Sequence, residues 1–179
     1  MFKAKAVLLS VALASAAWAV RADAQTCSSN TGSCTVGVTA SVAVPALISL
    51  DAGSTTLTLT PPDVADLATG YVQDAGPTFV VKANRTWTLA VHTSAAANWT
   101  YVGTQGGVKA IGDLTWSETV GGTYVAITGS AAPIVTSQAR TNAGAPTIFF
   151  RTLYSSDFSA DNNAAGSYSI PLVFTLSAP

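Results

Sequence analysis

The C-terminal segment Gly166-Ser-Tyr-Ser-Ile-Pro-Leu-Val-Phe-Thr-Leu-Ser177 gives the clearest indication of the fold class. Its apolar residues fall on every second position, and hydroxyl residues stand mostly between them. Successive side chains of a strand point to opposite faces, so the pattern predicts a strand with one apolar and one largely polar face. Pro171 has no backbone N–H, which predicts an edge strand or a break in pairing. Because one such strand is unstable alone, the preceding chain must complete a sandwich or barrel.

The same rhythm recurs along the chain. It predicts short strands over residues 35–44, 47–50, 55–60, 78–82, 86–93, 98–102, 113–120, 123–128 and 147–154. Residues 147–154 are apolar on both faces, as in a central strand, and Gly121-Gly122 predicts a tight hairpin. Thr60-Pro61-Pro62-Asp63 reads as a helix start with a capping hydroxyl, and Gly70 as its end. We therefore expect an all-β, antiparallel, immunoglobulin-like β-sandwich with one short helical turn.

Residues 1–24 have the composition of a cleaved secretory signal. Two lysines precede an apolar run over residues 6–20, and Ala22-Asp23-Ala24 forms a small-residue cleavage site before Gln25. A second such site, Ala17-Trp18-Ala19, would make Val20 the first mature residue. The run is too short to span a bilayer comfortably, and no later segment is long and apolar enough. The sequence predicts one exported domain over residues 25–179, passed through a bacterial periplasm and secreted or held at the cell surface.

The charge balance excludes some partners. The chain has 8 basic and 9 acidic residues, and charged residues make up only 9% of it, against about 25% in ordinary soluble domains. No basic patch for nucleic acid or anionic lipid is present in the sequence. The composition predicts an extracellular β-rich protein that binds no nucleic acid.

Cys27 and Cys34 are the only two cysteines, and they flank the turn-forming run Ser-Ser-Asn-Thr-Gly-Ser. In an oxidising compartment this spacing favours a disulfide between them. A loop this short would contribute about 2–3 kcal/mol of stability. A redox or metal pair is the weaker alternative, because the spacing is not C-x-x-C.

No catalytic constellation is found. His92 is the only histidine and Glu118 the only glutamate, so neither a Ser/His/Asp triad nor a multi-histidine metal site can be assembled. We expect no enzymatic activity, no cofactor and no metal centre. The oxygen-rich run from Asp157 to Asn163 leaves Ca²⁺ binding open, but a turn in which Asp and Asn side chains bond their own backbone is favoured.

Three aromatic residues offer a sugar-binding alternative. Trp99 and Tyr101 share one face of a predicted strand, and Tyr124 lies in the neighbouring hairpin. Exposed rings stack on sugars, which would make the chain a carbohydrate-binding module. Packing roles are favoured, because aromatic residues in strands are mostly buried.

The last third of the chain resembles a known group. Thr147-Ile-Phe-Phe-Arg-Thr-Leu, a polar loop, and Ala165-Gly-Ser-Tyr168 leading into the terminal strand are similar to the C-terminal pattern of secreted bacterial β-sandwich proteins, the spore coat protein U group and the chaperone–usher pilins. Gly166-Ser167-Tyr168 also looks like a tyrosine corner, with Tyr168 capping the loop that enters the strand.

The resemblance implies a structural or adhesive subunit of a surface fibre or coat. In such pilins an N-terminal extension of one subunit supplies a missing strand to the next. The alternating residues Val36, Val38, Ala40, Val42 and Val44 fit that role. The same residues also fit the first strand of this domain itself. The partners expected are further copies of the chain, another surface protein, or a glycan.

Overall fold

The computed structural model describes residues 28, 30 and 32–178. They fall into two units, residues 1–43 and 44–179. In the first unit the described residues form no helix or strand, and all of them are exposed. The strand expected over residues 35–44 as part of the domain's own sheet is therefore not seen. The secretory signal and Cys27 lie outside the described residues, so the cleavage site and the Cys27–Cys34 disulfide stay predictions.

The described part of the second unit is built almost entirely of strands. Its elements are β1 (Ile48–Ala52), α1 (Val64–Thr69), β2 (Tyr71–Ala75), β3 (Phe79–Ala83), β4 (Trp87–Thr93), β5 (Thr100–Val102), η1 (Ile111–Asp113), β6 (Leu114–Ser117), β7 (Val125–Ala126), β8 (Ala132–Gln138), β9 (Thr141–Gly144), β10 (Phe149–Leu153), η2 (Asp161–Asn163), β11 (Ser167–Ser169) and β12 (Leu172–Ser177). Every strand pair is antiparallel, which confirms the all-β antiparallel fold.

The first layer consists of two hydrogen-bonded sheets that lie end to end. Their strand orders are β1-β3-β9 and β2-β10-β6-β7. Between them the amide of Gly76 donates to the carbonyl of Ile148 at 2.8 Å, so β2 runs on into β3 beside β9 and β10. β10 pairs on both sides, with β2 and with β6, which confirms the central strand expected from its two apolar faces.

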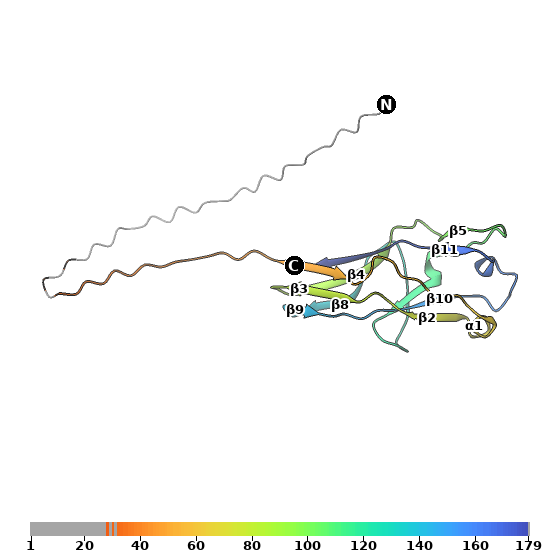
Figure 1. The fold of residues 1–179 in the computed structure, drawn as a ribbon, viewed down its shortest axis with the longest axis horizontal. Helices are drawn as coiled ribbons and strands as arrows, with labels where there is room; N and C mark the ends of the chain where they lie inside the picture. The colour runs from red at the N-terminus through yellow and green to blue at the C-terminus, as the bar shows by residue number, and fades with distance from the viewer. Residues whose placement is uncertain (1–27, 29, 31, 179) are drawn as a thin grey trace, which may run out of the picture. The chain divides into compact units, whose positions relative to one another are not determined.

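The second layer contains the C-terminal stretch. Its ladders are β12-β4-β8 and β11-β5. β11 and β12 are one run interrupted at Ile170 and Pro171, as the proline predicted, and β12 lies at the edge of its ladder. Figure 1 shows α1 and β11 at one end of the domain and the C-terminus at the other.

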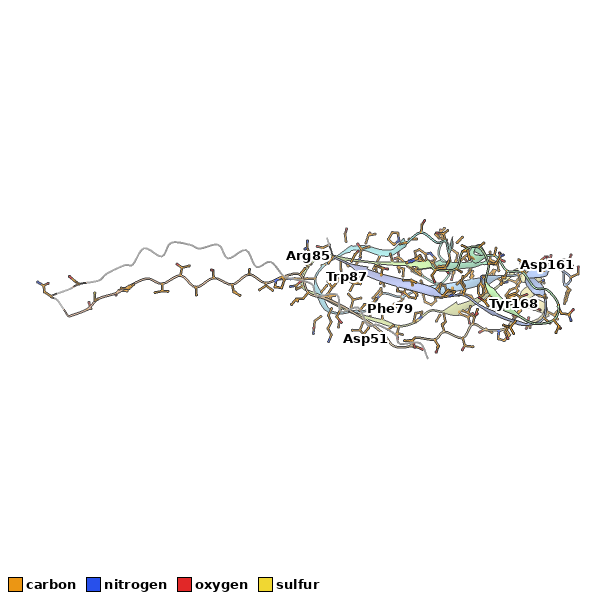
Figure 2. The ribbon with its side chains drawn as sticks, turned by 90° about the horizontal axis from the view of Figure 1, so that it is seen from above. Asp51, Phe79, Arg85, Trp87, Asp161 and Tyr168 are labelled. Atoms are coloured by element: carbon orange, nitrogen blue, oxygen red, sulfur yellow. The ribbon has the colours of Figure 1, made fainter. Side chains whose placement is uncertain are left out.

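Apolar side chains from the two layers meet in one core. In β4, the buried residues Trp87, Leu89 and Val91 alternate with half-buried ones, as their period-two spacing predicted. The rings of Phe79 on β3 and Phe174 on β12 lie 4.8 Å apart and join the layers. Figure 2 shows Phe79 between Trp87 at one end of the domain and Tyr168 at the other.

The short helix forms where it was expected but begins with a different cap. Asp63, not Thr60, is the N-cap: its carboxylate accepts from the Asp66 amide at 2.9 Å, and the Asp66 carboxylate accepts from the Asp63 amide at 2.9 Å. Thr60 instead bonds the Asp74 carboxylate. Gly70 ends the helix with φ of +87°, a conformation that favours glycine.

Several strand expectations are wrong. Residues 55–60 form no strand despite their alternation, while β2, β8 and β9 were not predicted. Gly121-Gly122 is not a two-residue hairpin, because β6 ends at Ser117 and β7 begins only at Val125. Among the described residues, none of the helices has the length and apolar character needed to cross a membrane.

Phe150 tests the core. It is fully buried in the central strand β10, so Phe150→Ala is expected to lower the free energy of unfolding by about 3–5 kcal/mol. Urea denaturation followed by fluorescence measures the change. Phe158, 65% exposed, supplies the matched control, and Phe158→Ala should change stability by less than about 0.5 kcal/mol. Equal effects of the two substitutions would contradict the described core.

Candidate functional site

A groove of about 1000 Å³ opens between residues 54–62 and residues 162–172. We call it the edge groove. Apolar side chains from both layers line its middle, namely Phe79, Leu114, Ile170, Leu172 and Phe174. Ile170, Leu172 and Phe174 are only half-buried although they pack against the core. The groove therefore exposes apolar surface that a complete sandwich would cover.

The strands that border this region are paired on one side only. Among the described residues β12 pairs with β4 alone, and β1 pairs with β3 alone. Each strand consequently has backbone N–H and C=O groups without a strand partner along its second side. Apolar side chains together with open backbone edges are what an added β-strand recognises.

Residues 54–62 form the opposite wall without regular secondary structure. Hydrogen bonds fix this wall in place. The Thr60 hydroxyl donates to the Asp74 carboxylate at 2.6 Å, and the Thr60 amide lies 3.2 Å from both carboxylate oxygens. Next to the other end, the amide of Gly53 donates to the carbonyl of Thr78 at 2.9 Å. The groove is thus bounded by ordered chain on both sides.

Lys109 makes one end of the edge groove polar. Its side chain is 1% exposed. The ammonium donates to the carbonyl of Leu153 at 2.5 Å and of Asn162 at 3.3 Å, and it lies 4.0 Å from the centre of the Tyr154 ring. Burial lowers the pKa of Lys109 from 10.5 to about 8, and the negative charge of Asp113 partly opposes this shift. The groove therefore holds a buried cation that is expensive to keep charged.

Unlike the Lys109 ammonium, three buried side-chain atoms of residues that line the groove have no hydrogen-bond partner. They are the indole nitrogen of Trp99, the hydroxyl of Thr152 and the side-chain oxygen of Asn162, and all three residues line the groove. Trp99 is 7% exposed and Thr152 only 3%. Buried polar groups are ordinarily hydrogen-bonded, so these three atoms are exceptions, as are His92 Nδ1 and Trp116 Nε1 outside the groove.

Tyr168 shapes this end of the groove. Its hydroxyl lies 3.0 Å from the carbonyl oxygen of Ala164 and 3.2 Å from that of Asp161, so it caps the loop before β11 as a tyrosine corner does. Its ring lies 5.0 Å from that of Tyr101 and 5.9 Å from the Lys109 ammonium. The motif read from the sequence is thus confirmed as a local structure.

The proposed sugar platform is not assembled as an exposed surface. Trp99 is buried, and its ring is part of the core. The hydroxyl of Tyr101 donates to the carbonyl of Ala165 at 2.8 Å, and that of Tyr124 to Gln73 at 2.8 Å. Packing, the favoured alternative, accounts for these three residues.

The loop from Asp157 to Asn163 bonds itself. Asp157 accepts from the amide and hydroxyl of Ser159 at 2.8 and 2.7 Å, which lowers the pKa of its carboxyl group. The Asn163 amide donates to the carbonyls of Ser155 and Asp157. The favoured turn interpretation is confirmed. In the described part of the chain, no three His, Cys, Asp or Glu side chains gather as a metal site would require.

His92 and Glu118 are not brought together into a site. His92 is half-buried, and its Nδ1 atom has no hydrogen-bond partner. Glu118 is exposed, and its backbone carbonyl accepts from the Thr147 hydroxyl at 3.0 Å.

The predicted donor residues are available for contacts. The exposed fractions are 47% for Val36, 88% for Val38, 87% for Val42 and 70% for Val44, and Ala40 is exposed as well. Lys109 and its neighbours, by contrast, were not identified from the sequence. The sequence feature that could have indicated Lys109 is a single lysine flanked by the apolar residues Val108 and Ala110-Ile111 in a chain with very few charges.

The comparisons with known proteins concern the fold. No protein-family model matches the chain, and no curated protein does. A structure of a chaperone–usher pilus, described in connection with rod uncoiling, matches with a TM-score of 0.45 and 16% identity, covering 87% of this chain and 100% of that one. The crystal structure of the P pilus rod subunit PapA matches with a TM-score of 0.45 and 13% identity, covering 76% and 100%. Both are distant likenesses, at 16% and 13% identity.

The lowered pKa of Lys109 predicts a pH dependence of stability. Between about pH 8 and 10.5 the unfolded chain keeps this proton while the folded chain releases it, so the free energy of unfolding should rise with pH there. The pKa values of Tyr154 and Tyr168 are raised mainly by burial, and the two residues oppose the trend above about pH 10, because the unfolded tyrosines then lose their protons first. Urea midpoints at several pH values from 8 to 9.5 measure the slope.

Lys109→Met provides the control for this slope. Met has similar length and no titrating group, so the variant should lose the rise between pH 8 and 9.5 whatever its absolute stability. An equal slope in both proteins would show that another group causes it.

Proposed function

We propose that this chain is an exported, non-enzymatic structural subunit of a bacterial surface fibre, assembled by strand donation. Residues 36–44 of one copy would fill the edge groove of the next. The observation that carries the proposal is the edge groove itself, which combines half-buried apolar side chains with two strands that are paired on one side only.

The donor segment complements the groove chemically. Its apolar side chains alternate with Gly37, Thr39, Ser41 and Ala43, so an extended conformation turns one apolar face toward the groove and a mostly polar face outward. Burying an exposed valine contributes roughly 1.5–3 kcal/mol before ordering costs. Four such valines supply roughly 6–12 kcal/mol, whereas ordering the backbone of nine residues costs roughly 9–18 kcal/mol. The main-chain hydrogen bonds of the added strand would have to supply the remainder.

The dimensions are also compatible. A strand rises about 3.3 Å per residue, so residues 36–44 extend over roughly 30 Å. The C-terminal run from Ser167 to Ser177 beside the groove has a similar number of residues. The incoming strand would pair its backbone along β12, which adds main-chain hydrogen bonds to the apolar contacts.

The wider properties of the sequence support the same role. The predicted secretory signal would carry the chain out of the cytoplasm, and the scarcity of charge leaves few groups for catalysis or nucleic-acid binding. A coat built from the same contacts is the closest variant of this proposal.

Charges placed on the two faces of the donor segment test the proposal. Val38→Asp together with Val42→Asp should abolish fibres, because the groove would bury two unpaired carboxylates. Thr39→Asp together with Ser41→Asp adds the same charge to the outward face and should leave assembly largely intact. Electron microscopy and sedimentation of the secreted proteins measure the outcome. Equal loss in both variants, or intact fibres in both, would refute the proposal.

Deletion of residues 25–44 separates donation from folding. The truncated chain should remain folded by circular dichroism and lose only self-assembly, and it should still accept the donor segment of an intact copy. A deleted chain that unfolds would show that the segment belongs to its own domain.

A further inference from the structure

The polar end of the edge groove has hydrogen-bonding capacity that the proposed donor segment leaves unused. The face of that segment that would enter the groove is made of valines and one alanine. Between residues 24 and 50 the sequence contains no Asp or Glu. A donor strand from a second copy therefore brings no acidic side chain to Lys109.

The positive charge of Lys109 has no carboxylate in contact with it among the described residues. In the described part of the chain the Lys109 ammonium contacts two carbonyl oxygens and two aromatic rings, while Asp113 acts on it only through space. The Asp113 carboxylate is already used, because it accepts from the amide of Ala110 at 3.1 Å. A buried cation is strongly stabilised when a carboxylate pairs with it and further donors complete the site.

We propose that the polar end of the edge groove is a carboxylate-binding subsite for an Asp or Glu side chain on an extended strand of a different protein. This inference rests on the proposed function, in that the groove is taken to bind strands. The partner is alternately apolar, like the donor segment, and differs from it by the acidic side chain at one end.

The unpaired atoms divide between the two kinds of group that such a strand carries. A carboxylate accepts hydrogen bonds from the Lys109 ammonium, the Trp99 indole N–H and the Thr152 hydroxyl. The side-chain oxygen of Asn162 is an acceptor, so it takes a backbone N–H of the incoming strand instead. Trp99, Thr152 and Asn162 line the same groove as Lys109, so two donors and one acceptor accompany the cation in this part of the site.

Synthetic peptides test the subsite on the full chain carrying Val38→Asp and Val42→Asp, the variant that is expected not to assemble. Each peptide carries the sequence of residues 35–44, extended by Glu or by Gln at its N-terminus or its C-terminus, so that both strand directions are covered. Calorimetry measures the affinities. One Glu peptide should bind about tenfold tighter than its Gln partner, as one charge-assisted hydrogen bond provides. In Lys109→Met and in Thr152→Val this preference should be reduced or lost.

NMR of the lysine side chains gives a second measurement that does not depend on peptide binding. Sodium acetate should shift the Lys109 signal and raise its titration midpoint, whereas acetamide should do neither. A response to acetate without any peptide binding would support the carboxylate subsite and refute strand binding. Equal Glu and Gln affinities together with no acetate response would overturn the subsite and indicate that water alone satisfies these atoms.

Discussion

The main constraint on this structure is that β12 has a hydrogen-bonded strand partner on one side only. A strand inside a sandwich needs partners for its backbone on both sides and cover for its apolar face, yet β12 is bonded only to β4 and its inward side chains stay half-buried. Natural proteins usually protect such an edge with charges, but Leu172–Ser177 contains none. An open, uncharged, apolar edge of this kind is a template for another strand, which is the basis of the proposed assembly.

The two ends of the groove impose different chemical demands. Its middle, around Phe79 and Phe174, gains from any apolar strand, because hydrophobic burial is non-directional. The end around Lys109 gains only from a group of the right charge and geometry. That end is held by the loop that Tyr168 caps and by carbonyls from β10 and η2, so its shape is fixed before a ligand arrives. Binding energy and selectivity are thus assigned to separate parts of one site.

Period-two spacing predicted the elements whose stability comes from burial on one or both faces. It predicted β4, β10 and β12. The short helix and its end at Gly70 were also predicted because their signals are local, although the N-cap is Asp63 and not the Thr60 hydroxyl. β9, with the sequence Thr-Asn-Ala-Gly, has little intrinsic preference for a strand and forms because β3 lies beside it. Residues 55–60 show the opposite case: their apolar and polar side chains alternate as in a strand, but no neighbouring strand pairs with them. The polar end escaped prediction because Lys109, Thr152 and Asn162 meet only through tertiary structure.

The proposed donor segment contains no acidic residue, so self-assembly and the binding of an acidic partner strand would place different demands on Lys109. A second copy that fills the groove leaves Lys109 without a counter-charge, which favours its neutral form given that its pKa is already near 8. A different protein that brings a carboxylate favours the charged form and gains a pairing that the donor segment lacks. The apolar contacts are available to both occupants, so the difference between them lies in one ion pair. Because a buried pair is only weakly screened by salt, this preference would persist outside the cell, where apolar contacts alone distinguish poorly between strands.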